Sequence, residues 1–135
     1  MGLADRIYKK GSFELETNTD GDVDTVKGEC LFREVTGGFE FTYKEETADT
    51  KIKLTSGRAE LERKGEISYK FRLEPEMSYD AVMNTPYGKM CVTVTGEDMM
   101  YMPTAKGFDG VLRYYLGQGA DKVHIIIALR VKFDK

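Results

Sequence analysis

Several residue types are scarce in this sequence of 135 residues: it has no tryptophan, one histidine, two cysteines and three prolines. The single histidine, His124, lies in the outward phase of its segment. A zinc site or a Ser-His-Asp triad built on it would need partners that converge on an outer face. The sequence also has no P-loop and no Gly-x-Gly-x-x-Gly turn. We therefore expect no metal and no cofactor.

Long apolar runs and an excess of basic charge are also missing. The longest apolar run, residues 124–129, is too short to cross a bilayer, and no signal peptide is recognisable. The net charge is -3 and the sign of charge alternates along most segments, which argues against a nucleic-acid surface. Cys30 and Cys91 fall in apparent strands without a framework spacing, which is typical of buried, reduced thiols. We expect a cytoplasmic protein without membrane or nucleic-acid partners, and the sequence leaves its oligomeric state open.

What the sequence has in abundance is an alternation of apolar and polar residues with a period of two. The alternation is clearest in residues 39–46, 50–54, 67–74, 90–94, 108–116 and 123–133. No stretch keeps a helical period over ten residues, and glycines separate the segments at the spacing of short strands. One apolar face per strand and few apolar edges favour a closed barrel over a sandwich. The fold prediction is all-β, a closed antiparallel meander barrel of nine to eleven strands. We expect a single domain over residues 1–135, with residues 1–10 as a possible N-terminal extension.

One residue breaks the alternation. In residues 58–67 the inward phase set by Ala59 and Leu61 continues to Arg63, where a charged side chain needs a partner. A two-residue turn at 56–57 would pair Arg63 with Thr50, and a four-residue loop over 46–49 would pair Thr50 with Glu45. These pairings predict an inward row of three residues and an ion pair between Glu45 and Arg63 inside one end of the barrel.

The turn that follows Arg63 is predicted from the same rule that paired residues share a face. A three-residue turn over 64–66 pairs Arg63 with Ile67 and places Gly65 in a left-handed conformation. The polar stretch around residues 18–29 is interpreted as a turn and not a calcium loop, because Val23 stands where that loop needs glycine.

A family resemblance rests on short motifs in a fixed order. They are a Tyr-x-Glu-Glu segment (Tyr43, Glu45, Glu46), an Arg-x-Gly pair (Arg63, Gly65), an aromatic–Gly pair (Tyr87, Gly88) and a late tyrosine at Tyr114 or Tyr115. In these motifs the chain, over residues 26–131, resembles the YwiB-like family of small bacterial proteins. The resemblance implies a calycin-type barrel, similar to lipocalins and streptavidin, and supplies no activity and no catalytic residues. Family members often have Tyr or His where Met83 stands here, so a pocket at that position would be more apolar.

The predicted site gathers inward polar residues near Arg63. The candidate ligand-binding residues are Tyr43, Glu45, Thr50, Arg63, Tyr69 and Tyr114. Buried tyrosines need hydrogen-bond partners, and the methionine-rich segment 77–102 could form a flexible wall. The leading hypothesis is a noncatalytic barrel that binds a small, partly apolar ligand at its mouth, with Arg63 available for a polar end.

Two alternatives stay open. Large inward side chains could fill the barrel, since narrow barrels either hold one small ligand or are filled. The protein could then bind a protein partner through its exterior. It could also be an enzyme that uses Glu45 as an acid or base, although a carboxylate beside an arginine is poorly activated. We expect no catalytic residues.

Overall fold

The computed structural model describes residues 8–55 and 57–134, which form one antiparallel sheet of ten strands and a short 3-10 helix. The first five strands are β1 (Lys9–Thr19), β2 (Asp22–Val35), β3 (Gly38–Lys44), β4 (Ala48–Thr55) and β5 (Arg58–Gly65). They are followed by β6 (Tyr69–Leu73), β7 (Ser78–Thr85), β8 (Gly88–Thr104), β9 (Gly107–Leu116), the helix η2 (Gly119–Asp121) and β10 (Val123–Phe133). The predicted all-β fold is confirmed, and ten strands fall within the predicted range.

The sheet is a meander that curls into a nearly closed barrel. Its strand order is β6-β5-β4-β3-β2-β1-β10-β9-β8-β7, so consecutive strands pair except β6 with β7, and β1 pairs with β10. The two edges, β6 and β7, meet at a seam with little backbone pairing. Ser68 and Asn84 exchange two backbone hydrogen bonds of 2.9 and 2.8 Å across it. Pro75 and Gly96 form a second isolated bridge.

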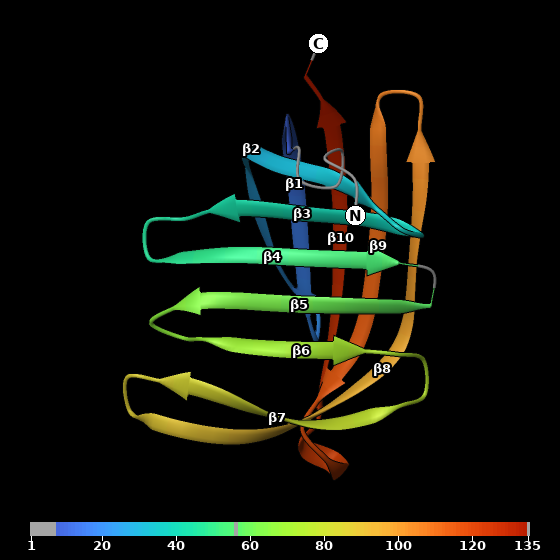
Figure 1. Cartoon of the computed structure of the whole chain (residues 1–135). Coiled ribbons are helices and arrows are strands. Elements are labelled where there is room, and N and C mark those ends of the chain that lie inside the picture. Colours follow the sequence, from blue (N-terminus) through green and yellow to red (C-terminus); the bar gives the residue numbers. More distant parts are fainter. Residues whose placement is uncertain (1–7, 56, 135) are drawn as a thin grey trace.

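Two long strands, β2 and β8, connect the two layers of the barrel. In Figure 1, β3 to β6 run at a steep angle to β1, β10 and β9, and β2 and β8 bend so that each continues from one layer into the other. The ladder between β8 and β9 shifts register between Gly96 and Asp98. A Cβ atom on Gly96 would lie 2.2 Å from the carbonyl oxygen of Glu74, so this corner admits only glycine.

Aromatic rings fill one end of the barrel. Phe39 and Phe108 stack with centroids 4.2 Å apart, and Phe32 packs edge-on against Phe108 at 6.2 Å. Phe133 stacks on the other side of Phe32 at 4.7 Å, and Tyr101 packs edge-on to Phe39. Because these rings occupy this end, free volume inside the barrel is left toward the other end, near the β3–β4 and β5–β6 loops.

The predicted inward phases are mostly confirmed by burial. Phe41, Ile52 and Leu61 are each at most 3% exposed. Ile67 and Met90 lie in the apolar phase of the alternating segments 67–74 and 90–94, but they are 42% and 58% exposed. Ile67 lies in a loop before β6, and Met90 lies near the tip of the β7–β8 hairpin. The alternation continues through these positions although no opposing layer covers them there.

The hairpin registers are correct in one case and shifted by two residues in two others. Thr50 pairs with Arg63 as predicted. Thr50 also pairs with Tyr43, so the predicted pairing with Glu45 is wrong. Glu45 lies one position beyond β3, where its backbone N–H donates to the carbonyl of Ala48 at 2.7 Å. This bond closes the loop earlier than predicted.

The turn after Arg63 is longer than predicted. Arg63 pairs with Tyr69 and not with Ile67, because the loop extends to Ser68. The Ser68 hydroxyl accepts from the Gly65 N–H at 3.1 Å and donates to the Gly65 carbonyl at 2.8 Å. Gly65 is not among the glycines with positive φ, so its predicted left-handed conformation is wrong. It is required for space instead, since a Cβ atom there would lie 2.3 Å from the carbonyl oxygen of Thr47.

Several smaller predictions can be placed in the fold. Cys30 is buried, but Cys91 is exposed because it lies in the outward phase of β8. A polar turn does join β1 to β2, with positive φ at Asp20 and Gly21, but it is shorter than the predicted stretch, because residues 22–29 belong to β2. Most of the expected N-terminal extension, residues 1–7, lies outside the described residues, whereas residues 9–10 belong to β1. Among the residues described, no helix has the length and apolar character needed to cross a membrane.

Candidate functional site

A cavity of about 360 Å³ lies inside the barrel, at the end opposite the stacked rings. Its lining comes from β1 to β7, β9 and β10. Five of the six predicted ligand-binding residues line it, namely Tyr43, Thr50, Arg63, Tyr69 and Tyr114. The sixth, Glu45, is not part of the lining but contacts one member of it. The sequence therefore brought together most of the polar residues of this cavity, without showing that the cavity exists.

The predicted ion pair is present at the mouth. Arg63 Nη1 lies 3.7 Å from Glu45 Oε1. The side chain of Arg63 is 30% exposed and that of Glu45 is 33% exposed, so the pair borders solvent and is not enclosed in the barrel. This position follows from the shifted register, which places Glu45 beyond the end of β3. The guanidinium is thus held at the rim and partly neutralised.

Three tyrosines project into the cavity from strands that are far apart in sequence. Tyr114 is 3% exposed and Tyr43 is 8% exposed, while Tyr69 is half-buried and stacks on Phe71 at 4.2 Å. Burial raises the pKa of all three hydroxyls above the ordinary value, and the nearby Tyr69 adds to this effect at Tyr114. Each tyrosine therefore stays protonated at neutral pH and keeps an O–H group to donate.

One buried hydroxyl at this site is under-satisfied. Tyr69 and Tyr114 line the cavity, but among the described residues that line it only Thr50 contributes a buried polar atom without a partner. Thr50 Oγ1 is buried and has no hydrogen-bond partner of ordinary geometry. The Tyr43 hydroxyl lies beside both Thr50, which acts to lower the pKa of Tyr43, and Glu45, which acts to raise it. Buried polar groups without partners are uncommon in native proteins and suggest that water or a ligand supplies the missing bonds.

The sequence reasoning missed other parts of the lining. Asp24 adds a second charged group, and its position two residues before the inward-facing Val26 could have revealed it. Apolar walls come from Leu15, Ile52, Leu61, Phe71, Leu116, Ile125 and Ile127. Among the described residues, Met83 is the one methionine that lines the cavity. Its apolar side chain agrees with the expectation that a pocket at this position would be more apolar. Most of the other methionines of segment 77–102 are exposed, so this segment as a whole does not form a flexible wall.

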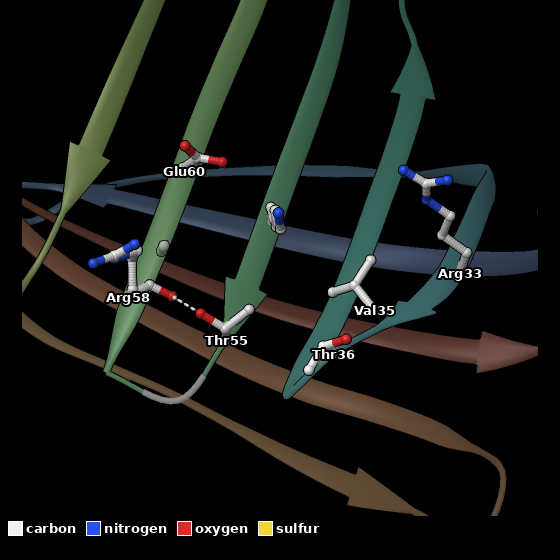
Figure 2. Close-up of a pocket in the computed structure, with 8 residues that line it drawn as sticks. Arg33, Val35, Thr36, Thr55, Arg58 and Glu60 are labelled. Atoms are coloured by element: carbon white, nitrogen blue, oxygen red, sulfur yellow. Dashed lines mark hydrogen bonds between the residues drawn. The ribbon is translucent and has the colours of Figure 1, made fainter. Parts of the chain in front are cut away.

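A second hollow lies on the exterior of the sheet. This groove has a volume of about 460 Å³. Figure 2 shows Arg33, Val35, Thr36, Thr55, Arg58 and Glu60 around it. Arg58 Nη2 lies 2.8 Å from Glu74, and Arg33 Nη2 lies 3.2 Å from Glu40. Because both guanidinium groups are engaged in ion pairs, the groove is a weaker candidate for a charged ligand than its composition suggests.

Glu40 is a buried charge on this exterior face. It lies in the polar phase of the alternating segment 39–46, on the outer face of the sheet, but it is only 5% exposed. Tyr8 covers it and donates a hydrogen bond to Oε1, and Arg33 donates to Oε2 at 3.2 Å. Burial acts to raise the pKa of Glu40, but these bonds and the charges of Arg33 and Lys51 outweigh it, so the net pKa is lowered. The cluster ties the start of β1 to the outer face of β2 and β3.

The cavity has no metal-binding character in the part of the chain that the structure describes. No group of three His, Cys, Asp or Glu side chains there could hold a metal ion. The chemistry available in the cavity is therefore that of neutral hydroxyl donors within apolar walls, with charged groups at one side.

Comparisons with known proteins give a family and a fold. A family model described as a domain of unknown function, DUF1934, matches residues 10–126. The crystal structure of the ywiB protein from Bacillus subtilis is similar to this chain, with a TM-score of 0.70 and 13% sequence identity. The alignment covers 99% of this chain and 100% of that one, and at this identity it shows a shared fold alone. No curated protein matches the sequence.

Proposed function

The chain belongs to the DUF1934 family of domains of unknown function, and we propose that it is a noncatalytic binder of a small, partly apolar ligand. The ligand occupies the cavity of about 360 Å³ at the open end of the barrel. Pockets that hold small molecules typically start at about 300 Å³ and combine apolar walls with a few convergent polar groups. The cavity has both properties.

One observation carries the proposal: a buried hydroxyl, Thr50 Oγ1, lacks a protein partner in a cavity that three tyrosines also line. The hydroxyls of Tyr69 and Tyr114 and the Thr50 Oγ1 atom all belong to the lining. A barrel filled for stability alone would have apolar side chains there, since an unpaired buried hydroxyl costs about 1–3 kcal/mol. A ligand that bonds to these groups offsets that cost in the bound state.

The enzyme alternative has less support. Glu45, the residue considered as an acid or base, does not line the cavity, and its carboxylate faces Arg63. It is therefore not placed to exchange a proton with a molecule bound among the tyrosines.

The first experiment is native mass spectrometry of protein purified without denaturation. We expect added mass from a copurified small molecule, and saturable binding of the apolar fluorophore dimethylaminonaphthalene. Leu116→Trp places an indole at the cavity wall and should abolish both signals. Asp109→Trp adds an indole at an exposed position of the same strand and should change neither.

Two results would contradict the proposal. The first is a bare polypeptide mass together with no saturable binding of the fluorophore. The second is equal binding by Leu116→Trp and the wild type, which would place the fluorophore outside the cavity. A bound polypeptide in the mass spectrum would favour the exterior-binding alternative, and the exposed apolar side chains of the β7–β8 hairpin, Val82, Tyr87 and Met90, would then be the first surface to test.

A further inference from the structure

The polar groups of the cavity differ in kind between its inner part and its mouth. The innermost polar group is the phenol of Tyr114, at 3% exposure, whereas Tyr69 lies directly across from Arg63 and stands between the inner part and the mouth. Burial raises the pKa of Tyr114 and Tyr69, so both remain neutral O–H donors. Tyr69 lies close enough to Tyr114 to contribute to the raised pKa of Tyr114, and both side chains line the same cavity. The complementary group on a ligand is an oxygen or nitrogen with lone pairs.

The charged groups of the lining are confined to the mouth. Arg63 is the one cationic side chain in the described lining, and its Nη1 atom lies 3.7 Å from Glu45. Asp24, at an exposed position near the β1–β2 turn, is the one carboxylate in that lining. Counted together, the mouth has two carboxylates and one guanidinium. An anionic ligand would meet a net negative rim and would have to compete with Glu45 for Arg63.

An ionic group would be poorly tolerated deeper in the cavity. The inner walls are apolar, from Ile52, Leu61 and Ile127 among others, and offer no opposite charge. Burying an ion without a partner costs far more than burying a neutral polar group that gains a hydrogen bond. The same reasoning excludes a buried ammonium group as well as a buried carboxylate.

The aromatic walls fix the shape of the available space. Tyr69 stacks on Phe71 with an interplanar angle of 16°, and Tyr114 packs edge-on to Phe71 with centroids 6.4 Å apart. Met83, on β7, faces these rings with a flexible thioether side chain that can adapt to different outlines.

We propose that the cavity selects an uncharged, mainly apolar molecule whose inner end carries a hydrogen-bond acceptor such as a carbonyl oxygen. This inference rests on the proposed function and narrows it to a ligand class. The acceptor bonds to the hydroxyls of Tyr69 and Tyr114, and the apolar body lies against the aliphatic and aromatic walls. The Glu45–Arg63 pair stays intact when the ligand binds.

The test uses three fluorophores with one ring system: dimethylaminonaphthalene, its propionyl ketone and the corresponding carboxylate. Fluorescence titration gives the dissociation constant of each. We expect the ketone to bind more tightly than the unsubstituted ring by about three- to tenfold, the gain from a net hydrogen bond. The carboxylate should bind at least about a hundredfold more weakly than the ketone.

The tyrosine variants connect this preference to the proposed hydroxyls. Tyr114→Phe and Tyr69→Phe remove only an oxygen, and each should weaken the ketone about threefold or more while leaving the unsubstituted ring within about twofold. Tyr115→Phe is the control, since this neighbouring tyrosine bonds to Glu97 away from the cavity. Circular dichroism and thermal melting confirm that each variant is folded.

The outcomes separate this inference from the proposed function. If the carboxylate binds as tightly as the ketone, or if both variants leave the ketone unaffected, the inference is wrong and the binding function stands. If none of the three fluorophores binds and the purified protein also shows a bare polypeptide mass, the proposed function itself is wrong.

Discussion

The ion pair at the cavity mouth makes a quantitative prediction about stability. Arg63→Met and Glu45→Gln, made singly and together, form a double-mutant cycle that isolates the interaction between the two side chains. We expect a coupling free energy of about 0.3–1 kcal/mol, the range of solvent-exposed ion pairs. A truly buried pair, as the sequence pattern implied, would lose about 3–5 kcal/mol when one partner is removed.

The magnitude follows from the geometry. At the 3.7 Å separation of Arg63 Nη1 and Glu45 Oε1, two unit charges attract by about 1 kcal/mol in water and by about 4 kcal/mol at an effective dielectric constant near 20. Both side chains are about a third exposed, which places the pair near the water limit. Ordering two long side chains reduces the net value further.

The assay is urea unfolding at neutral pH, followed by circular dichroism because the chain has no tryptophan. The coupling should shrink at about 1 M salt, where the Debye length is about 3 Å. Asp98 and Arg113, an exposed pair at 3.0 Å on β8 and β9, provide a control cycle of similar size. A coupling above about 2 kcal/mol that resists salt would refute the reasoning, and so would a coupling of the opposite sign.

Three further predictions concern other parts of the molecule. Glu40→Gln should destabilise the fold by about 1–3 kcal/mol at neutral pH, because it disturbs hydrogen bonds to a buried charge. Since the folded-state pKa of Glu40 is lowered, this contribution is present above the ordinary carboxyl value of 4.5 and is lost as the pH falls through the folded value. Urea titrations at several pH values should therefore show the difference narrowing in acid, and a constant difference would contradict the cause given. Cys91 should react readily with a thiol reagent in the native state, whereas Cys30 should react only on unfolding, since burial raises its pKa to about 11. Equal reaction rates for the two thiols would show that Cys30 is not protected. Phe108→Ala should cost about 3–5 kcal/mol through the loss of the stacked rings. Val23→Ala, at a position 56% exposed, should change thermal stability little, and equal losses for both variants would contradict the burial argument.

The fold was predictable because alternation alone specifies which face each strand buries. The tight turn before β5 allows one register close to it in which paired residues share a face of the sheet. That register pairs Thr50 with Arg63. The two errors, at Glu45 and at Ile67, were both shifts of two residues. A shift of two keeps every side chain on its own face, so the hydrophobic pattern cannot detect it. Local hydrogen bonds, such as those between Ser68 and Gly65, decide the loop length instead.

The cavity was harder to predict than its residues. The many large inward side chains suggested a filled barrel. The total volume of these side chains does not tell where inside the barrel free space remains. The structure segregates rings such as Phe32, Phe39 and Phe108 at one end, which leaves space at the other. The burial of Glu40 has a similar origin, because it depends on Tyr8, a residue outside the predicted strands.

The pairing of the first strand with the last strand has a consequence for how the chain folds as it is synthesised. Strands β1 to β6 can pair in order as consecutive hairpins emerge, but β1 finds its second partner only when β10, the last strand, is complete. Until then both edges of the growing sheet, β1 and β6, present unpaired backbone groups. Such edges are templates for pairing with other chains, and contacts between distant parts of a sequence form slowly. The period of greatest aggregation risk is therefore the interval between the appearance of β6 and the docking of β10, and not any state of the finished barrel.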